Sequence, residues 1–242
     1  MTAEIIASRH PADHDVVVLA GGLGTRLRGA IGALPKILAP VAGRPFLDIL
    51  LDHIARHGFR RVILLLGYRA DAVRAHLASR PSALDVEIFV ETTPLGTAGA
   101  LRTAVPHVQS DPVLVMNGDS FVQFDAVAFL DAYQRSGAPA ALVSVMVPDA
   151  SRYGALDIDS DERVVRFLEK RPGGGPGPIN AGGLSAEPPV SRDHAAERRP
   201  VVRARCARAA AARNAAVASN PRAVSRYRHA GKPDAGPDRT RA

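Results

Sequence analysis

Cysteine is almost absent from this chain, because Cys206 is the only one in 242 residues. A disulfide framework is therefore excluded, and a reducing compartment suits the protein. Long hydrophobic runs are also lacking, since the run at residues 62–66 is far shorter than the ~20 residues that cross a bilayer. Residues 1–15 are polar and lack the apolar core of a signal peptide. We therefore expect a cytoplasmic protein without a membrane partner.

Acidic residues are outnumbered by basic ones only at the carboxyl-terminal end. The whole chain has a formal net charge of +7. Residues 182–242 hold 12 Arg and 1 Lys against 5 acids, a net of +8, whereas residues 1–181 have a net of −1. A basic chain often binds nucleic acid, but this tail offers one large aromatic side chain, Tyr227, for base stacking. We therefore do not expect a nucleic-acid partner.

The body of the chain alternates apolar strand patterns with helical patterns. Such an alternation is typical of a parallel sheet covered on both faces. We predict an α/β fold, with a Rossmann-like, mostly parallel sheet and helices on both faces. Ligands of these sheets bind at the carboxyl ends of the strands. The predicted strands are residues 16–19, 61–66, 86–90, 113–117 and 140–147, and the predicted helices are residues 45–58, 70–79, 97–105 and 125–136.

The pattern changes at residue 153 and breaks at residue 182. Short strands are predicted at residues 153–158 and 164–169. Residues 182–242 contain no Ile, Phe, Met or Trp and a single Leu, Leu184, so they cannot bury enough apolar surface to offset their ordering entropy. We predict a disordered or weakly helical tail there. It is either a native basic extension or, as we favour, the product of a shifted reading frame, because GC-rich codons read out of frame give Arg, Ala, Pro and Gly.

A glycine-rich loop follows the first predicted strand. It reads Gly21-Gly22-Leu23-Gly24-Thr25-Arg26-Leu27 and precedes Pro35-Lys36. Glycines let backbone N–H groups approach a phosphate closely, and Arg and Lys add positive charge beside it. The chain lacks the P-loop pattern Gly-x-x-x-x-Gly-Lys-Ser/Thr, and Leu27 stands where the dinucleotide pattern Gly-x-Gly-x-x-Gly needs its third glycine. The loop therefore indicates a phosphate site of another type.

This loop resembles the signature of sugar-1-phosphate nucleotidyltransferases, Gly-Gly-x-Gly-Thr-Arg-Leu followed by Pro-Lys and Pro-Val. Within that family, Leu-Pro-Lys-Ile-Leu-Ala-Pro-Val-Ala-Gly-Arg-Pro-Phe-Leu-Asp at residues 34–48 is most similar to the D-glycero-D-manno-heptose 1-phosphate guanylyltransferases. The resemblance extends over residues 15–181. It implies a nucleotidyltransferase domain at residues 15–181, which consists of a nucleotide-binding core at 15–148 and a partial sugar-binding part at 149–181. An N-terminal extension at 1–14 precedes this domain, and the unmatched tail at 182–242 follows it.

The resemblance implies transfer of a nucleotidyl group from a nucleoside triphosphate to a sugar 1-phosphate, with release of pyrophosphate and with Mg²⁺ as cofactor. Arg26 and Lys36 would hold the phosphates. Asp119 would bind the metal, because a hard cation prefers carboxylate and phosphate oxygens. These three are the predicted catalytic residues. The predicted nucleotide-binding residues are Leu19, Gly21, Gly22, Gly24, Thr25, Glu91, Pro94, Gly96 and Thr97.

Glu91 decides the expected base. Its carboxylate can accept hydrogen bonds from both N1–H and N2–H of guanine, whereas uracil or thymine offers one donor between two acceptors. We therefore favour GMP transfer from GTP, with a thymidylyl- or uridylyltransferase acting on a hexose 1-phosphate as the alternative. Thr97 is expected to cap the following helix. By resemblance, the predicted sugar-phosphate-binding residues are Gly154, Glu169, Lys170 and Asn180.

One part of the family pattern is missing. The second metal-binding Asp of these enzymes lies in the carboxyl-terminal third, within an Asp-x-Gly-like segment. The strands that should lead to it are lacking here, and Asp234 and Asp238 of the tail are poor substitutes. A nucleotide-binding pseudoenzyme, or a truncated inactive fragment, is therefore an alternative to an active enzyme. A homo-oligomer is compatible with the sequence.

Two histidines share one face of a predicted helix. His53 and His57 are four residues apart, but no Glu stands between them as in a zinc-protease motif. We interpret them as surface or partly buried residues rather than metal ligands.

Overall fold

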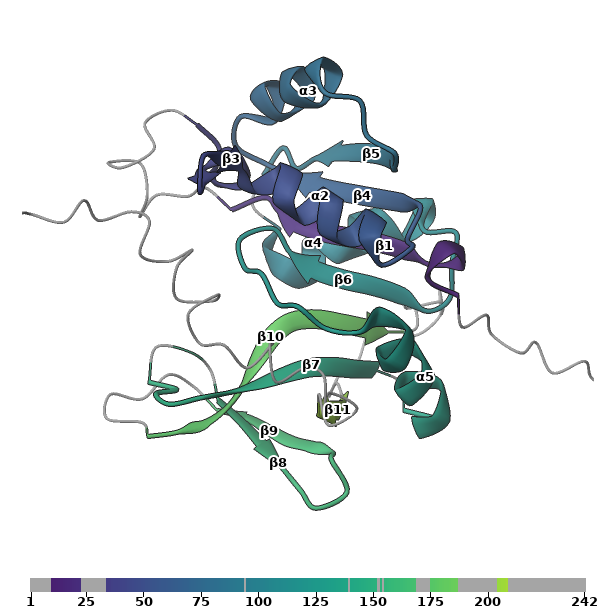
Figure 1. Ribbon diagram of the computed structural model, residues 1–242, viewed down its shortest axis with the longest axis vertical. Helices are drawn as coiled ribbons and strands as arrows, with labels where there is room; N and C mark the ends of the chain where they lie inside the picture. The colour runs from purple at the N-terminus through teal and green to yellow at the C-terminus, as the bar shows by residue number, and fades with distance from the viewer. Residues whose placement is uncertain are drawn as a thin grey trace, which may run out of the picture.

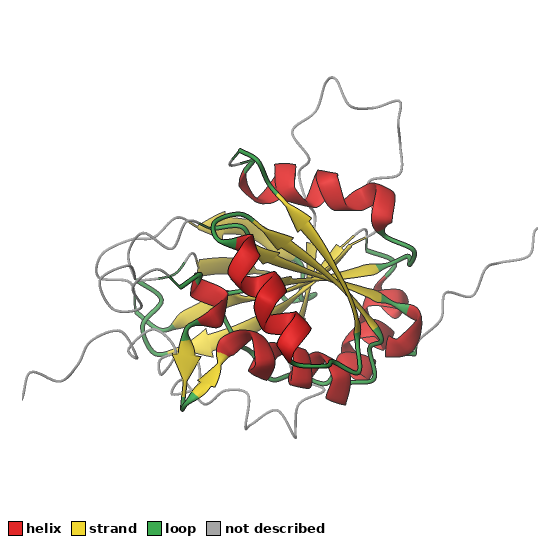
Figure 2. Ribbon diagram, turned by 90° about the horizontal axis from the view of Figure 1, so that it is seen from above, coloured by secondary structure: helices red, strands yellow, loops and turns green. Residues whose placement is uncertain are grey.

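A nine-stranded sheet forms the centre of the molecule and has helices on both faces (Figure 1, Figure 2). The computed structural model describes residues 10–22, 34–93, 95–138, 140–151, 153, 155–168, 175–186 and 204–208. Within them the strands follow the order β11-β7-β10-β6-β1-β4-β5, and the β8–β9 hairpin is attached to β10. The strands are β1 (Asp15–Ala20), β4 (Arg61–Leu66), β5 (Asp85–Val90), β6 (Val113–Asn117), β7 (Ala140–Val147), β8 (Ala155–Ile158), β9 (Val164–Leu168), β10 (Gly177–Ala186) and β11 (Ala204–Arg208).

The amino-terminal half of the sheet is parallel. β1 pairs with β4 on one side and β6 on the other, and β4 pairs with β5. Val16 and Val18 of β1 belong to the core shared with helices α2 (Phe46–Arg56) and α3 (Ala70–Ser79), whereas Val17 belongs to the core on the opposite face, shared with α4 (Gly96–Ala104). Helices cover both faces, which explains the apolar runs at residues 16–20 of β1 and 62–66 of β4. The predicted α/β fold is confirmed.

Local sequence sets two of the helix boundaries. α2 begins after Pro45 and is followed by Gly58, whose φ of +88° suits glycine. α5 (Ala126–Ser136) begins after Asp125, whose carboxylate accepts a hydrogen bond from the Ala128 N–H at 3.0 Å. This side chain satisfies a backbone donor that has no partner within the helix.

The start of α4 differs from the prediction. The helix begins at Gly96, Leu95 is its N-cap residue, and no side chain caps it. Thr97 is therefore the second residue of the helix rather than its cap. The reason is Gly96, whose φ of +68° is accessible to glycine and turns the chain into the helix one residue early.

The carboxyl-terminal half of the sheet is antiparallel around β10. This strand lies between β6 and β7 and pairs antiparallel with both. It continues to Ala186, beyond the boundary predicted at residue 181, and β11 pairs in parallel with β7. The structure thus differs from the predicted disordered or weakly helical tail in these two segments. Strand pairing uses main-chain N–H and C=O groups, so a segment poor in apolar side chains can still join a sheet.

Short elements connect the larger ones and help to place the site. η3 (Lys36–Leu38) follows Pro35, and a small hairpin leads from it into α2. The hairpin strands are β2 (Pro40–Val41) and β3 (Arg44–Pro45), and the remaining short helices are η1 (Pro11–Asp13) and η4 (Val105–His107).

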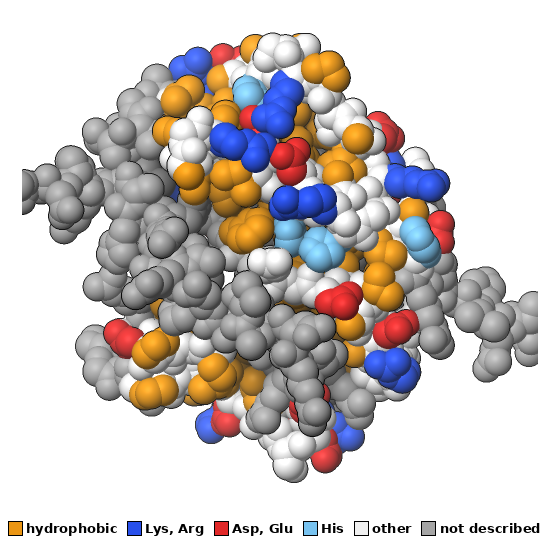
Figure 3. Space-filling model, in the orientation of Figure 1, with side chains coloured by type: hydrophobic (Ala, Val, Ile, Leu, Met, Phe, Trp, Pro, Cys, Tyr) orange, Lys and Arg blue, Asp and Glu red, His pale blue; other side chains and the backbone are white. Residues whose placement is uncertain are grey.

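Charges of both signs are interspersed on the face of the molecule seen in Figure 3. Two arginines are paired with aspartates of α2: Arg44 with Asp52 at 2.6 Å, and Arg80 with Asp48. Among the described residues, no helix has the length and hydrophobicity needed to cross a membrane.

Candidate functional site

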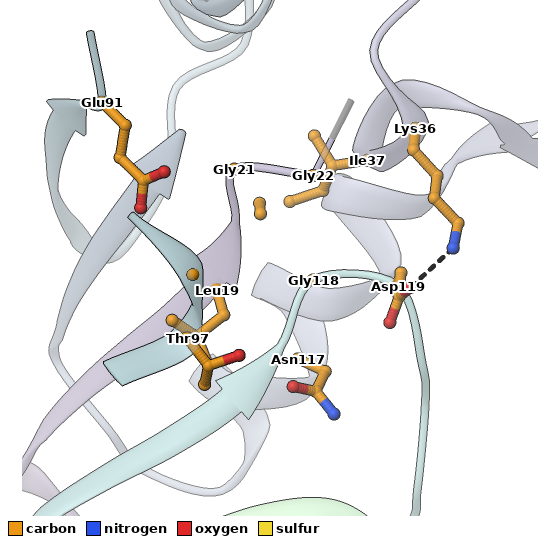
Figure 4. Close-up of a pocket in the computed structure, with 12 residues that line it drawn as sticks. Leu19, Gly21, Gly22, Lys36, Ile37, Glu91, Thr97, Asn117, Gly118 and Asp119 are labelled. Carbon is orange, nitrogen blue, oxygen red and sulfur yellow. Dashed lines mark hydrogen bonds and ion pairs between the residues drawn. The ribbon is translucent and has the colours of Figure 1, made fainter. Parts of the chain in front are cut away.

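A cavity of about 340 Å³ opens where β1 and β6 end (Figure 4). Ligands of parallel sheets bind at this edge, because the loops that follow the strands meet there. The lining residues are Leu19, Ala20, Gly21, Gly22, Lys36, Ile37, Glu91, Gly96, Thr97, Asn117, Gly118 and Asp119. Of the residues predicted for the site, the structure therefore brings together Leu19, Gly21, Gly22, Lys36, Glu91, Gly96, Thr97 and Asp119.

The other predicted site residues are not placed at this cavity. Asn180 lies on β10, is exposed, and is not among the lining residues. The remainder lie outside the described residues, and they are Gly24, Thr25, Arg26, Pro94, Gly154, Glu169 and Lys170.

The glycines after β1 leave main-chain atoms open to the cavity. Among the described residues, a Cβ added at Gly22 would meet no atom within 4 Å. No described side chain therefore stands between a bound anion and the backbone at Gly22. Gly21 is more enclosed, because a Cβ there would lie 3.1 Å from Oε2 of Glu91.

A lysine and an aspartate face each other at the cavity. Lys36, the first residue of η3, donates a hydrogen bond from Nζ to Oδ2 of Asp119 at 2.5 Å (Figure 4). The two side chains are 31% and 51% exposed. An ion pair this exposed contributes about 1 kcal/mol or less, so either partner can turn toward a charged ligand.

Close packing with β1 fixes the main chain just before Asp119. The N–H of Gly118 donates to the carbonyl oxygen of Leu19 at 2.8 Å. A Cβ at Gly118 would lie 2.7 Å from the Cβ of Ala20, so a larger residue does not fit. Gly118 therefore holds Asp119 beside the end of β1.

Glu91 forms the wall opposite the lysine. It follows β5, and its N–H donates to the carbonyl oxygen of Leu66 at 2.8 Å, which extends the pairing with β4 by one residue. Its half-buried carboxylate points into the cavity on the side of Gly21 (Figure 4). A carboxylate in this position can accept two parallel hydrogen bonds from a planar ligand.

The side chains at the cavity could bind a metal ion only if a bound ligand supplied further oxygen atoms. Within the described part of the chain, no group of three or more His, Cys, Asp or Glu side chains could hold a metal ion. Asp119 supplies one exposed carboxylate at the cavity. A hard cation would fit there if phosphate oxygens and water completed its coordination.

Four lining residues are not among the predicted site residues: Ala20, Ile37, Asn117 and Gly118. Asn117 ends β6 directly before Gly118 and Asp119, so its place at a strand end was a usable signal. Ile37 is 2% exposed and has the character of a core residue. Nothing in its local sequence distinguishes it from the rest of the core.

The two histidines of α2 lie outside the cavity, and one of them differs from the prediction. His53 is 4% exposed, and its ring centroid lies 4.4 Å from that of His57 and 4.7 Å from that of Phe121. Burial lowers the pKa of His53 to about 4, with further lowering by the charges of His57 and Arg56. His53 is thus a core residue, because the segment after β6 covers it, whereas His57 is partly buried as predicted.

Comparison with known proteins agrees with this geometry. The family model described as nucleotidyl transferase matches residues 15–182. A mannose-1-phosphate guanylyltransferase from Mycobacterium tuberculosis is 37% identical over 169 residues, which are 69% of this chain and 47% of that protein. A D-glycero-alpha-D-manno-heptose 1-phosphate guanylyltransferase from Campylobacter jejuni is 30% identical over 154 residues, 64% of this chain and 67% of that protein. The chain thus spans about half the length of the first relative.

A solved structure extends the likeness to three dimensions. HddC from Yersinia pseudotuberculosis, complexed with GMP-PN, is 35% identical and superimposes with a TM-score of 0.67. The match covers 75% of this chain and 80% of HddC.

Proposed function

The chain belongs to the nucleotidyl transferase family, and we propose that it transfers GMP from GTP to a sugar 1-phosphate, giving a GDP-sugar and pyrophosphate. The observation that supports this most directly is the cavity itself. Open glycine backbone after β1 faces Lys36 of η3 and Asp119, which follows β6. A cytoplasmic location, where a lone cysteine stays reduced, is part of the proposal.

The proposed reaction requires that the two substrates be aligned and that the negative charge of the phosphates be offset, and it does not require a general base. An oxygen of the sugar phosphate attacks the α-phosphorus of GTP, the bond to the α–β bridging oxygen breaks, and pyrophosphate leaves with that electron pair. The attacking oxygen is already anionic at neutral pH. Gly21 and Gly22 would bind phosphate oxygens through the main chain, and Lys36 would offset charge that develops near the α-phosphate.

We also propose Mg²⁺ as the cofactor, held by Asp119 together with phosphate oxygens. When bound, the ion would withdraw charge from the phosphates and make pyrophosphate a better leaving group. Lys36 would leave Asp119 as the nucleotide arrives, because a phosphate is a stronger competitor for the ammonium than one exposed carboxylate.

Glu91 supports the choice of GTP. Its two oxygens line the cavity and can accept from N1–H and N2–H of guanine, a pairing that uracil and thymine cannot supply. The guanylyltransferase relatives and the GMP-PN complex of HddC support the same base. For the sugar we propose a heptose 1-phosphate, from the resemblance of residues 34–48 to heptose 1-phosphate guanylyltransferases and from the similarity to those enzymes.

Pyrophosphate release tests the proposal. Purified chain is mixed with GTP and Mg²⁺, with or without a sugar 1-phosphate, and pyrophosphate is measured. Release should require the sugar phosphate, and Asp119→Asn should lose most of it. Asp85→Asn is the matched control, because Asp85 is 75% exposed at the opposite end of a strand from the cavity. Equal activity of Asp119→Asn and wild type would remove Asp119 from the mechanism.

A second candidate function is nucleotide binding without turnover. It is favoured by one observation: the family model matches residues 15–182, and residues 183–242 lie outside that match. Saturable GTP binding without a GDP-sugar product, for every sugar 1-phosphate supplied, would select this function.

A further inference from the structure

One side-chain contact at the cavity crosses a neighbouring strand. β4 lies between β1 and β5 in the sheet. Nevertheless the carboxylate of Glu91, which follows β5, lies against Gly21, which follows β1. A Cβ added at Gly21 would lie 3.1 Å from Oε2 and 3.4 Å from Oε1 of Glu91. The Glu91 side chain must therefore pass the end of β4 to reach β1 (Figure 4).

The residue at that crossing is Gly67, directly after β4. A Cβ at residue 67 would lie 2.6 Å from the carbonyl oxygen of Gly21 and 3.3 Å from its Cα. Such an approach to main-chain atoms is too close for any side chain, so the end of β1 would have to move. The φ of Gly67 is not in the left-handed region. Space, rather than backbone conformation, therefore requires glycine here.

We propose that Gly67 is a positioning residue for base selectivity. It is not itself among the residues that line the cavity. By having no side chain, it lets the main chain of Gly21 lie close beside it, and so keeps Gly21 next to the space that the carboxylate of Glu91 occupies. This inference rests on the proposed use of Glu91 to recognise guanine.

Gly118 offers an internal comparison on the other side of β1. It too is crowded against β1, but through Ala20 and next to Asp119. Two tightly packed glycines thus flank the end of β1: Gly67 on the side of Glu91, and Gly118 on the side of the aspartate. An added methyl group at Gly67 should reduce the selectivity for the base, whereas one at Gly118 should weaken the proposed binding of the phosphates and the metal ion.

Gly67→Ala tests the proposal on the full chain. Calorimetry gives the Kd of GTP and of UTP, and the wild type should prefer GTP. In Gly67→Ala the ratio of the two Kd values should shrink by about tenfold or more, because small misplacements of recognition groups have large effects. Gly118→Ala should weaken both nucleotides and keep their ratio. Gly175→Ala should match the wild type, since a Cβ there meets no described atom within 4 Å and residue 175 does not line the cavity.

The outcomes separate this inference from the proposed function. A wild type without preference for GTP overturns both. A wild type that prefers GTP, together with a Gly67→Ala variant of unchanged ratio, overturns only the role of Gly67. Should Gly67→Ala fail to fold, Glu91→Asp replaces it, since one methylene fewer keeps the charge but shortens the reach to Gly21. That variant should lose the GTP preference to a similar extent, and an unchanged preference would overturn the proposal.

Discussion

Acidification is expected to destabilise the protein through His53. This side chain is buried between α2 and the segment after β6, and in the described part of the chain its Nε2 has no hydrogen-bond partner. Burial is the main reason why the pKa of His53 falls from 6.5 to about 4. The imidazole is therefore neutral in the folded protein, whereas the unfolded chain accepts a proton as the pH falls below 6.5.

The sign and the size of the effect follow from these two values. Because the folded-state pKa lies below the unfolded one, the stabilisation by neutral His53 is complete above about pH 6.5 and is lost as the pH falls toward 4. Each pH unit between the two values is worth 1.36 kcal/mol. Between pH 6.5 and pH 5 the free energy of unfolding should therefore fall by about 2 kcal/mol from this residue.

Urea unfolding at pH 7 and pH 5 measures the loss. His53→Phe removes the titrating group and leaves an aromatic ring of similar shape beside Phe121. Any constant packing effect cancels, because each variant is compared with itself at the two pH values. His53→Phe should lose about 2 kcal/mol less than the wild type, whereas His10→Gln, at an exposed residue, should follow the wild type. Equal losses in the wild type and His53→Phe would refute the reasoning.

Further predictions concern the site and the fold. Lys36→Ala should lower kcat/KM for GTP by about 100-fold, because it removes the charge that we propose binds the phosphates, while thermal unfolding changes little because its ion pair is exposed. Arg61→Ala should destabilise the fold by about 3 kcal/mol in urea unfolding, since it removes the guanidinium that lies 2.9 Å from the carboxylate of the buried Asp15; a loss below 1 kcal/mol would contradict this. Asp125→Ala should cost about 1 kcal/mol by the same assay, because α5 loses its N-cap hydrogen bond.

The parallel half of the fold was predictable because its signals are local. β4 and β6 have the predicted bounds, since each contains an apolar run that ends at a glycine or a polar residue. The start of α4 was not predictable from Thr97, because the positive φ of Gly96 depends on the loop before it. The sheet membership of residues 182–186 and 204–208 was missed for another reason. It depends on main-chain pairing, which composition does not report.

The candidate site shows the same division between local and non-local signals. Gly21, Gly22 and Asp119 each follow an apolar strand, so their placement at one sheet edge could be expected from the sequence. The contact between Glu91 and Gly21 could not, because it requires knowing that β4 lies between their strands. His53 was misjudged likewise, because its burial depends on Phe121 in a distant segment.

The distribution of the cavity residues along the chain bears on the choice between turnover and binding alone. All of them lie between residues 19 and 119, on or next to β1, β5, β6, η3 and α4. The pairing of β1 with β4 and β6 involves no residue of the predicted sugar-binding part at residues 149–181. Nucleotide affinity therefore tests residues 19–119, and pyrophosphate release tests whether the remainder of this chain completes the enzyme. Suppose that the chain releases no pyrophosphate, and that substitutions of Lys36 or Glu91 lower its affinity for GTP. Nucleotide binding would then be assigned to residues 19–119, and the missing catalytic step to the remainder of the chain.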